Sequence, residues 1–220
     1  MITLASLIER FGPAFLAQYH KALLPSHREA LNAMKLCRTS MAPRMLAQCS
    51  GCDQQLMVPH SCGHRSCPHC QHFESQRWLE RQTQRLVAGN YFLLTFTLPA
   101  ELRPLAWQHQ RIVYDLLMDC AWQTLRTFSQ NHRHLQGSPG AIAVLHTHAR
   151  DLQFHPHVHL VIPGTAMDAD RRLWRSLPAT AKYLFNHKAL AKVFRAKLLA
   201  ALYQQDITPP AALPQKWVVD

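Results

Sequence analysis

The stretch His155-Pro156-His157-Val158-His159-Leu160-Val161-Ile162 alternates polar and apolar side chains with a period of two. Side chains on a β-strand alternate between its faces, so His157 and His159 share one face and the aliphatic residues share the other. Two imidazoles on one strand face can hold two adjacent positions of a divalent cation and leave room for a third ligand, water and substrate. The stretch therefore predicts a half-buried strand that carries a metal site.

A second pair of histidines precedes this stretch, in Leu145-His146-Thr147-His148. One alternating pair on a strand is explained well enough by outward-facing polar positions. Four imidazoles on neighbouring strands favour a metal instead. We expect His146 to be the third ligand, with His148 and Gln153 as the alternatives.

The surrounding chain predicts an α+β domain in which helices pack against an antiparallel sheet. Strands are expected over residues 91–98, 141–148 and 157–163, and helices over 101–129 and 188–203. Residues 3–35 have helical spacing that is broken at Pro13 and Pro25, so they form a helical lead-in. We therefore expect two domains, a helical and zinc-ribbon DNA-binding domain over 1–86 and a domain over 87–220.

Six of the seven cysteines lie between Cys37 and Cys70, in a segment without helical period. Two C-x-x-C pairs are typical of a closed tetrahedral zinc site; they predict that Zn²⁺ is bound by Cys49, Cys52, Cys67 and Cys70. Redox chemistry and disulfides are the weaker alternatives. A second zinc site, or simple packing, stays open for the remaining candidates, which are Cys37, His60, Cys62 and His64.

The net charge of the 220 residues is +11 with histidine neutral. The excess lies on the flanks, since residues 1–86 and 165–220 each carry +5 and the middle only +1. Such a surface attracts polyanions, and nucleic acid is the usual partner. A basic helix over residues 73–87 is expected to present Arg77, Arg81 and Arg85 to DNA along one face. No apolar run is long enough to span a membrane. Cysteines clustered near histidines indicate metal chemistry in a reducing compartment, so we expect a protein of a bacterial-type cytoplasm, associated with the nucleoid.

These motifs together resemble the rolling-circle transposases of the insertion-sequence-ninety-one family, which are HUH endonucleases named for a His-hydrophobic-His signature. His157-Val158-His159 matches that signature. The resemblance continues in chain order through most of the sequence, in these segments: Cys37-Arg38-Thr39, the two C-x-x-C pairs, His60-Ser61-Cys62, Trp78-Leu79-Glu80, Phe96-Thr97-Leu98-Pro99, Val161-Ile162-Pro163-Gly164 and Val193-Phe194-Arg195.

The resemblance implies an RNA-recognition-like or palm-like sheet and metal-dependent nicking and joining of single-stranded or hairpin DNA. A tyrosine would form a phosphotyrosyl link, and Mg²⁺ or Mn²⁺ held by His157 and His159 would polarise the phosphate. The resemblance makes residues 87–220 an HUH transposase domain. The family's nucleophile lies downstream of a strand that resembles Trp217-Val218-Val219, so we expect this chain to lack it and the domain to be incomplete at its C-terminus. The alternatives are a non-catalytic, zinc-dependent DNA-binding remnant and, less well supported, a metallohydrolase. The sequence leaves the oligomeric state and the DNA target open.

Overall fold

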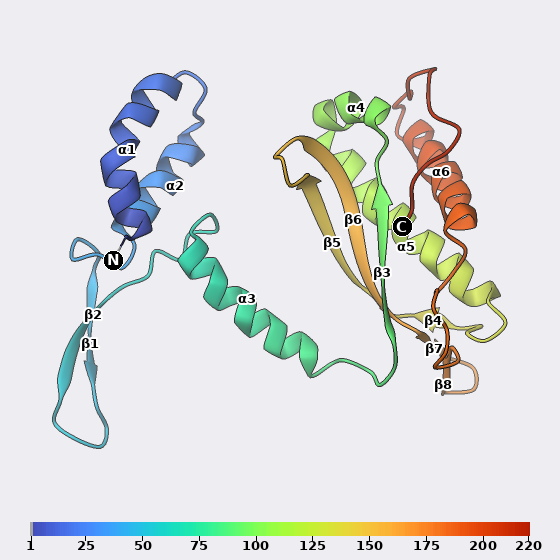
Figure 1. The fold of residues 1–220 in the computed structure, drawn as a ribbon, viewed down its shortest axis with the longest axis horizontal. Coiled ribbons are helices and arrows are strands. Elements are labelled where there is room, and N and C mark those ends of the chain that lie inside the picture. Colours follow the sequence, from blue (N-terminus) through green and yellow to red (C-terminus); the bar gives the residue numbers. More distant parts are fainter. Residues whose placement is uncertain (1) are drawn as a thin grey trace. The chain divides into compact units, whose positions relative to one another are not determined.

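A computed structural model describes residues 2–220 of the chain. The chain divides into two compact units, Met1–Leu86 and Val87–Asp220 (Figure 1). Along the described residues, no helix combines the length and the apolar character needed to cross a membrane.

The first unit begins with two helices, α1 (Leu4–Tyr19) and α2 (Pro25–Leu36). Thr3 and Ser6 form a reciprocal capping box that starts α1. Pro25 starts α2, where its missing N–H costs nothing. The expected break at Pro13 is absent, because α1 continues through it. Pro13 removes one donor from an exposed helix, where water can hydrate the freed carbonyl.

A two-stranded hairpin and a third helix complete this unit. Strands β1 (Arg44–Gln48) and β2 (Gln55–Pro59) pair antiparallel, and they are not among the strands expected from the sequence. Helix α3 spans Pro68–Thr83 rather than the expected residues 73–87. It begins earlier because Cys67 is its N-cap and Pro68 is well suited to a first helical position.

The second unit is built on a three-stranded antiparallel sheet with the order β3-β6-β5. These strands are β3 (Tyr91–Thr97), β5 (Ile142–His148) and β6 (Phe154–Pro163), in agreement with the three expected strands apart from their ends. The register pairs His159 with Thr95 on β3 and with Val144 on β5. Residues paired in this way point to the same side of the sheet.

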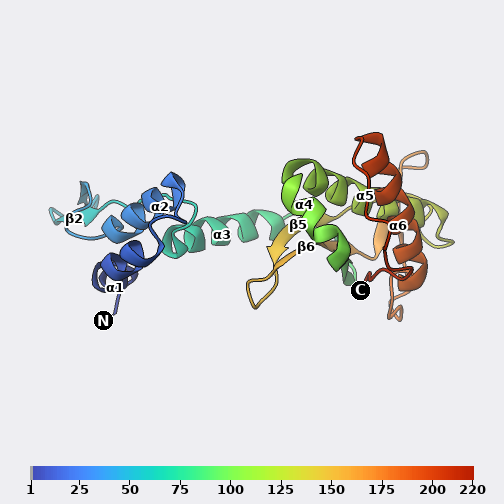
Figure 2. The same ribbon diagram turned by 90° about the horizontal axis from the view of Figure 1, so that it is seen from above.

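Helices cover one face of this sheet (Figures 1 and 2). The expected helix over 101–129 is three shorter elements, η1 (Ala100–Leu102), α4 (Arg103–Gln108) and α5 (Gln110–Asn131), and α6 spans His187–Gln204. The aliphatic face of β6 packs against them in a continuous core. Phe96 and Phe194 meet in this core with ring centroids 4.9 Å apart. The opposite face of β6, which carries the histidines, is left partly exposed.

Two smaller features extend the unit. Strands β4 (Ser138–Pro139), β7 (Thr165–Asp168) and β8 (Leu173–Ser176) form a second antiparallel sheet. Gly137 lies so close to β7 that a β-carbon there would be 2.6 Å from the Met167 carbonyl oxygen. Asp220 exchanges two backbone hydrogen bonds with Thr95, so the last residues pair with the outer edge of β3. The α+β fold expected from the sequence is confirmed.

Candidate metal centres

Three histidines converge on the exposed face of the sheet in the second unit. His157 and His159 come from β6, and His146 comes from β5, directly opposite His157 in the register. Each offers one ring nitrogen, and the three nitrogens lie within 4.8 Å of one another. The ring centroids are 4.7 to 5.2 Å apart. The structure thus brings together the pair expected from the alternating pattern and the preferred third candidate.

The other two candidates for the third position do not join this cluster. A β-bulge between His146 and His148 shifts the register, so that His148 lies opposite Phe154 and its Nδ1 is 2.9 Å from the Thr147 hydroxyl. Gln153 lies exposed in the turn before β6. The bulge explains why period-two reasoning, which placed His148 with His146, does not hold there.

The surroundings of the cluster favour the neutral form of His159 and orient two of the three rings. Burial, followed by the neighbouring His157 and His146, lowers the pKa of His159. Nδ1 of His159 is 3.0 Å from the Thr95 hydroxyl, and Nδ1 of His157 is 2.6 Å from the His155 carbonyl oxygen. Partly exposed imidazoles that are oriented in this way are suitable ligands for a divalent transition metal.

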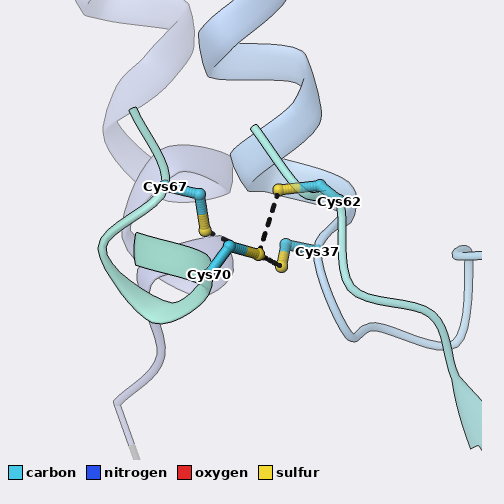
Figure 3. Close-up of side chains that lie close together, drawn as sticks. All are labelled: Cys37, Cys62, Cys67 and Cys70. Carbon is cyan, nitrogen blue, oxygen red and sulfur yellow. Dashed lines mark hydrogen bonds between the residues drawn. The ribbon is translucent and has the colours of Figure 1, made fainter. Parts of the chain in front are cut away.

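A second convergence lies in the first unit, where four thiols meet (Figure 3). Their sulfur atoms lie within 4.8 Å of one another, and the four residues are Cys37, Cys62, Cys67 and Cys70. Cys67 and Cys70 are buried at the start of α3, while Cys37 ends α2 and Cys62 follows β2. Four cysteines around one point, with no carboxylate or imidazole among them, are typical of a structural zinc site.

The thiol pKa values are consistent with a site that needs a cation. Burial raises the pKa of Cys62 to about 12, although a backbone N–H lowers it in part. Burial also raises the pKa of Cys70, but the Gly63 N–H and the three neighbouring thiols outweigh it and lower the pKa to about 7. Because crowded thiolates repel one another, all four can ionise together only when a metal ion neutralises them.

The structure does not bring Cys49 and Cys52 to Cys67 and Cys70. These two cysteines form the turn at the tip of the β1–β2 hairpin, and both are exposed. Strands of five residues hold this tip about 16 Å from the base of the hairpin. The structure therefore favours a different ligand set from the expected one, in which Cys37 and Cys62 replace the tip cysteines.

Because Cys37 and Cys62 lack C-x-x-C spacing, the sequence alone leaves them either to a second zinc site or to simple packing. They meet because they flank the hairpin, whose base is closed by the hydrogen bond from the His60 N–H to the Pro43 carbonyl. The signal that could have identified them is the pair of short apolar runs on either side of Cys49–Cys52, which predicts a hairpin. His60 and His64 stay outside the four-thiol cluster.

The three arginines expected to contact DNA are all exposed. Arg77 and Arg81 lie one turn apart on α3, and the Arg77 guanidinium lies over the Phe73 ring, 5.7 Å from its centroid. Arg85 lies beyond the end of α3, so it does not continue the helical stripe as expected. The pair on α3 can contact successive phosphates of a nucleic acid strand.

Three of the four tyrosines of the second unit lie apart from the histidine cluster. Tyr114 and Tyr203 are on α5 and α6, which cover the opposite face of the sheet, and Tyr183 is exposed in the segment before α6. Tyr91 is on the histidine side of β3 but four residues from Thr95, which is about 13 Å along a strand. Its hydroxyl donates a hydrogen bond to the Val87 carbonyl oxygen and accepts one from the Val87 N–H.

Comparison with known proteins gives two family matches. A family model described as "Transposase zinc-binding domain" matches residues 7–98, and one described as "Putative transposase" matches residues 140–215. The first of these contains the four-thiol cluster, and the second contains the three-histidine cluster.

Two relatives carry transposase names. The chain is 34% identical over 198 residues to "Putative transposase y4qJ" of Sinorhizobium fredii, covering 90% of this chain and 49% of the relative. It is 30% identical over 151 residues to the transposase for insertion sequence element IS801 of Pseudomonas savastanoi pv. phaseolicola, covering 68% and 36%. The chain thus spans about half of the first relative and about a third of the second.

Among solved structures, the chain is similar to the conjugative relaxase TrwC in complex with oriT DNA. The metal-free structure of that complex matches with a TM-score of 0.43 and 18% identity over 58% of this chain and 48% of the relaxase. The metal-bound structure matches with a TM-score of 0.40 and 17% identity over 51% and 43%.

Proposed function

Because the chain belongs to the insertion-sequence-ninety-one family of transposases, we propose that it acts in DNA transposition, by nicking single-stranded DNA and transferring the broken strand. The observation that carries this proposal is the convergence of His146, His157 and His159 on the exposed face of the sheet. A folded core supports that face from behind, and the face is open to a substrate as large as a DNA strand.

The donor set fits a divalent cation with open coordination positions. Three imidazoles suit Mn²⁺ better than Mg²⁺, which prefers oxygen ligands. When bound there, such a cation would polarise the scissile phosphate and stabilise the charge that develops in the transition state. His146, His157 and His159 would hold and orient the ion, and the exposed sheet face would accept the strand.

We propose that the nucleophilic tyrosine comes from outside residues 2–220. The positions of Tyr114 and Tyr203 behind the sheet support this, since neither helix reaches the histidine face. Tyr91 is on the right face, but its hydroxyl already bonds to Val87 and its place in β3 keeps it far from the cluster. Tyr91, Tyr114 and Tyr203 are therefore poorly placed to attack a phosphate at the cluster, which favours a nucleophile from a further segment or another chain.

The first unit would contribute DNA affinity rather than chemistry. A Zn²⁺ bound by Cys37, Cys62, Cys67 and Cys70 would leave no open position for a reaction. It would fix the start of α3, and with it the direction of Arg77 and Arg81. The two exposed guanidiniums support a role in gripping the phosphates of single-stranded or hairpin DNA in the bacterial nucleoid.

Mn²⁺ binding and DNA cleavage chemistry test this proposal. The parent chain should bind Mn²⁺, and His157→Ala and His159→Ala should each abolish binding, while His148→Ala, a change in an imidazole outside the cluster, should not. With a hairpin oligonucleotide and Mn²⁺, the chain alone should form no denaturant-stable adduct. Fusion to a tyrosine-bearing helix of the family, added downstream of this chain, should restore that adduct.

Two outcomes would contradict the proposal. An adduct formed by the chain alone would mean that one of its five tyrosines is the nucleophile. The second outcome is a DNA affinity that changes neither with Mn²⁺ nor with the histidine substitutions, together with no adduct after fusion. It would favour the alternative of a non-catalytic DNA-binding remnant.

A further inference from the structure

The three histidines of the cluster are not held equally. His157 and His159 each have Nδ1 within hydrogen-bond distance of a group on the protein. His146 is on the edge strand β5, next to the bulge, and within residues 2–220 its ring has no hydrogen-bond partner. Two of the three rings are therefore oriented before any metal binds.

The acceptor decides the tautomer of His157. A carbonyl oxygen can only accept, so the distance of 2.6 Å to the His155 carbonyl oxygen requires a proton on Nδ1 of His157. The other ring nitrogen, Nε2, then carries the lone pair that a metal needs. Metal-ligating histidines commonly use such a partner to fix both tautomer and ring direction.

Thr95 occupies the corresponding place for His159. The N–H and C=O of Thr95 both bond to Asp220, so Thr95 and His159 form a non-hydrogen-bonded pair across β3 and β6. Side chains approach most closely in pairs of this kind, which brings the hydroxyl to 3.0 Å from Nδ1. Hydrogen bonds on the β3 edge hold the Thr95 backbone, and its branched side chain has few rotamers.

We propose that Thr95 is a positioning residue for the metal site: its hydroxyl oxygen accepts a hydrogen bond from the Nδ1–H of His159 and so presents Nε2 to the cation. This inference rests on the proposed function, because it assigns a role at the same three-histidine site. His157 and His159 would then hold the ion with rings that are already oriented, and His146 would be the adjustable third ligand.

A neighbouring threonine supplies a matched control. Thr97 is on the same strand and the same face, and it is paired with His157 just as Thr95 is paired with His159. Its N–H likewise bonds to the terminal segment, at Val218. Nδ1 of His157 is already satisfied by the His155 carbonyl, so a hydroxyl at position 97 has no ring to orient.

Mn²⁺ titration followed by electron paramagnetic resonance tests the proposal on the full 220-residue chain. Thr95→Val should weaken Mn²⁺ binding about 10- to 100-fold, the range found when such supporting partners are removed. Thr95→Ser keeps the hydroxyl and should restore most of the affinity. Thr97→Val should bind Mn²⁺ as the parent does. Equal binding by Thr95→Val and the parent, or equal losses in Thr95→Val and Thr97→Val, would overturn the assignment.

A second measurement needs no metal and separates this inference from the proposed function. Long-range ¹H–¹⁵N spectra of the histidine rings should show the Nδ1–H tautomer for His159 in the parent and Thr95→Ser, and a shift towards the Nε2–H tautomer in Thr95→Val. A parent His159 with its proton on Nε2 would refute the role of Thr95, whatever the affinity for Mn²⁺. If the tautomer is as expected but the parent binds no Mn²⁺, the proposed metal centre fails while the orientation of His159 by Thr95 stands.

Discussion

The candidate metal sites of the two units differ in their position relative to the hydrophobic core. Within residues 2–86, the buried hydrophobic side chains are few, namely Ala30, Ala42, Cys67 and Cys70, and two of these are candidate zinc ligands. In Val87–Asp220 a large aliphatic and aromatic core lies between the sheet and the helices, and the histidines are on the other side of the sheet. In the first unit the thiol cluster makes up much of the small buried interior, whereas in the second unit the histidine cluster lies on a sheet whose other face is packed against a large core.

This difference predicts which unit unfolds when its metal is removed. A segment that buries little apolar surface cannot offset the conformational entropy lost on folding, so the first unit depends on its metal. The second unit folds on its own buried surface, and its candidate metal site is an addition on the exposed face. Removing metal should therefore unfold one unit and leave the other folded.

The largest effect is expected from removing zinc. Structural zinc sites contribute about 10 to 16 kcal/mol at neutral pH, so chelation or Cys37→Ser should unfold the first unit and spare the second. Zinc content and far-ultraviolet circular dichroism measure this. Cys49→Ser is the matched control, because Cys49 lies at the hairpin tip, outside the cluster. Loss of zinc from Cys49→Ser but not from Cys37→Ser would restore the ligand set expected from the C-x-x-C pairs.

The next largest effect is expected on the stability of the second unit, when a buried side chain of its core is truncated. Phe194 is fully buried between Phe96 and Trp217. Phe194→Ala should lower the free energy of unfolding of this unit by about 3 to 5 kcal/mol, because it leaves a cavity. Urea unfolding followed by tryptophan fluorescence measures the loss, and the zinc content should not change. A fall in zinc content with Phe194→Ala would contradict the independence of the two units.

A smaller effect concerns DNA binding by the first unit. Replacing Arg77 and Arg81 by Ala should weaken binding to a hairpin oligonucleotide and reduce the slope of its salt dependence by about one unit for each phosphate that is no longer neutralised. Arg85→Ala should have less effect, since Arg85 lies past the end of α3. Fluorescence anisotropy at several salt concentrations measures both. Equal losses of affinity from all three positions would favour the continuous stripe expected from the sequence.

The smallest effect is on the pH dependence of the second unit. Burial at the end of α5, followed by the charges of His134 and Arg133, lowers the pKa of His132. Because His132 has its usual pKa of 6.5 in the unfolded chain and a lower pKa in the folded chain, the unfolded chain binds a proton on His132 more readily. The free energy of unfolding should therefore decrease as the pH falls below 6.5. His132→Asn should flatten the stability profile between pH 7 and about pH 5, and melting temperatures measure it. A steeper profile in the variant would reverse the assigned sign.

The sequence by itself determined the features that depend on local pattern. Alternation with a period of two placed His157 and His159 on one face of a strand, because neighbouring side chains on a strand point in opposite directions. The apolar patterns of β3, β5, β6 and α6 likewise predicted these elements, since each element buries one face against the core. The match of the histidine motif to a transposase family also needed only adjacent residues.

Tertiary structure alone decided which distant residues meet. Closure of the β1–β2 hairpin brings Cys37 to Cys62 and carries Cys49 and Cys52 away, although the C-x-x-C spacing favoured the tip cysteines. One β-bulge keeps His146 in its cluster and turns His148 out of it. The pairing of Thr95 with His159 likewise depends on the register of β3 against β6. Register and hairpin closure are set by interactions between segments far apart in the chain, and local spacing does not encode them.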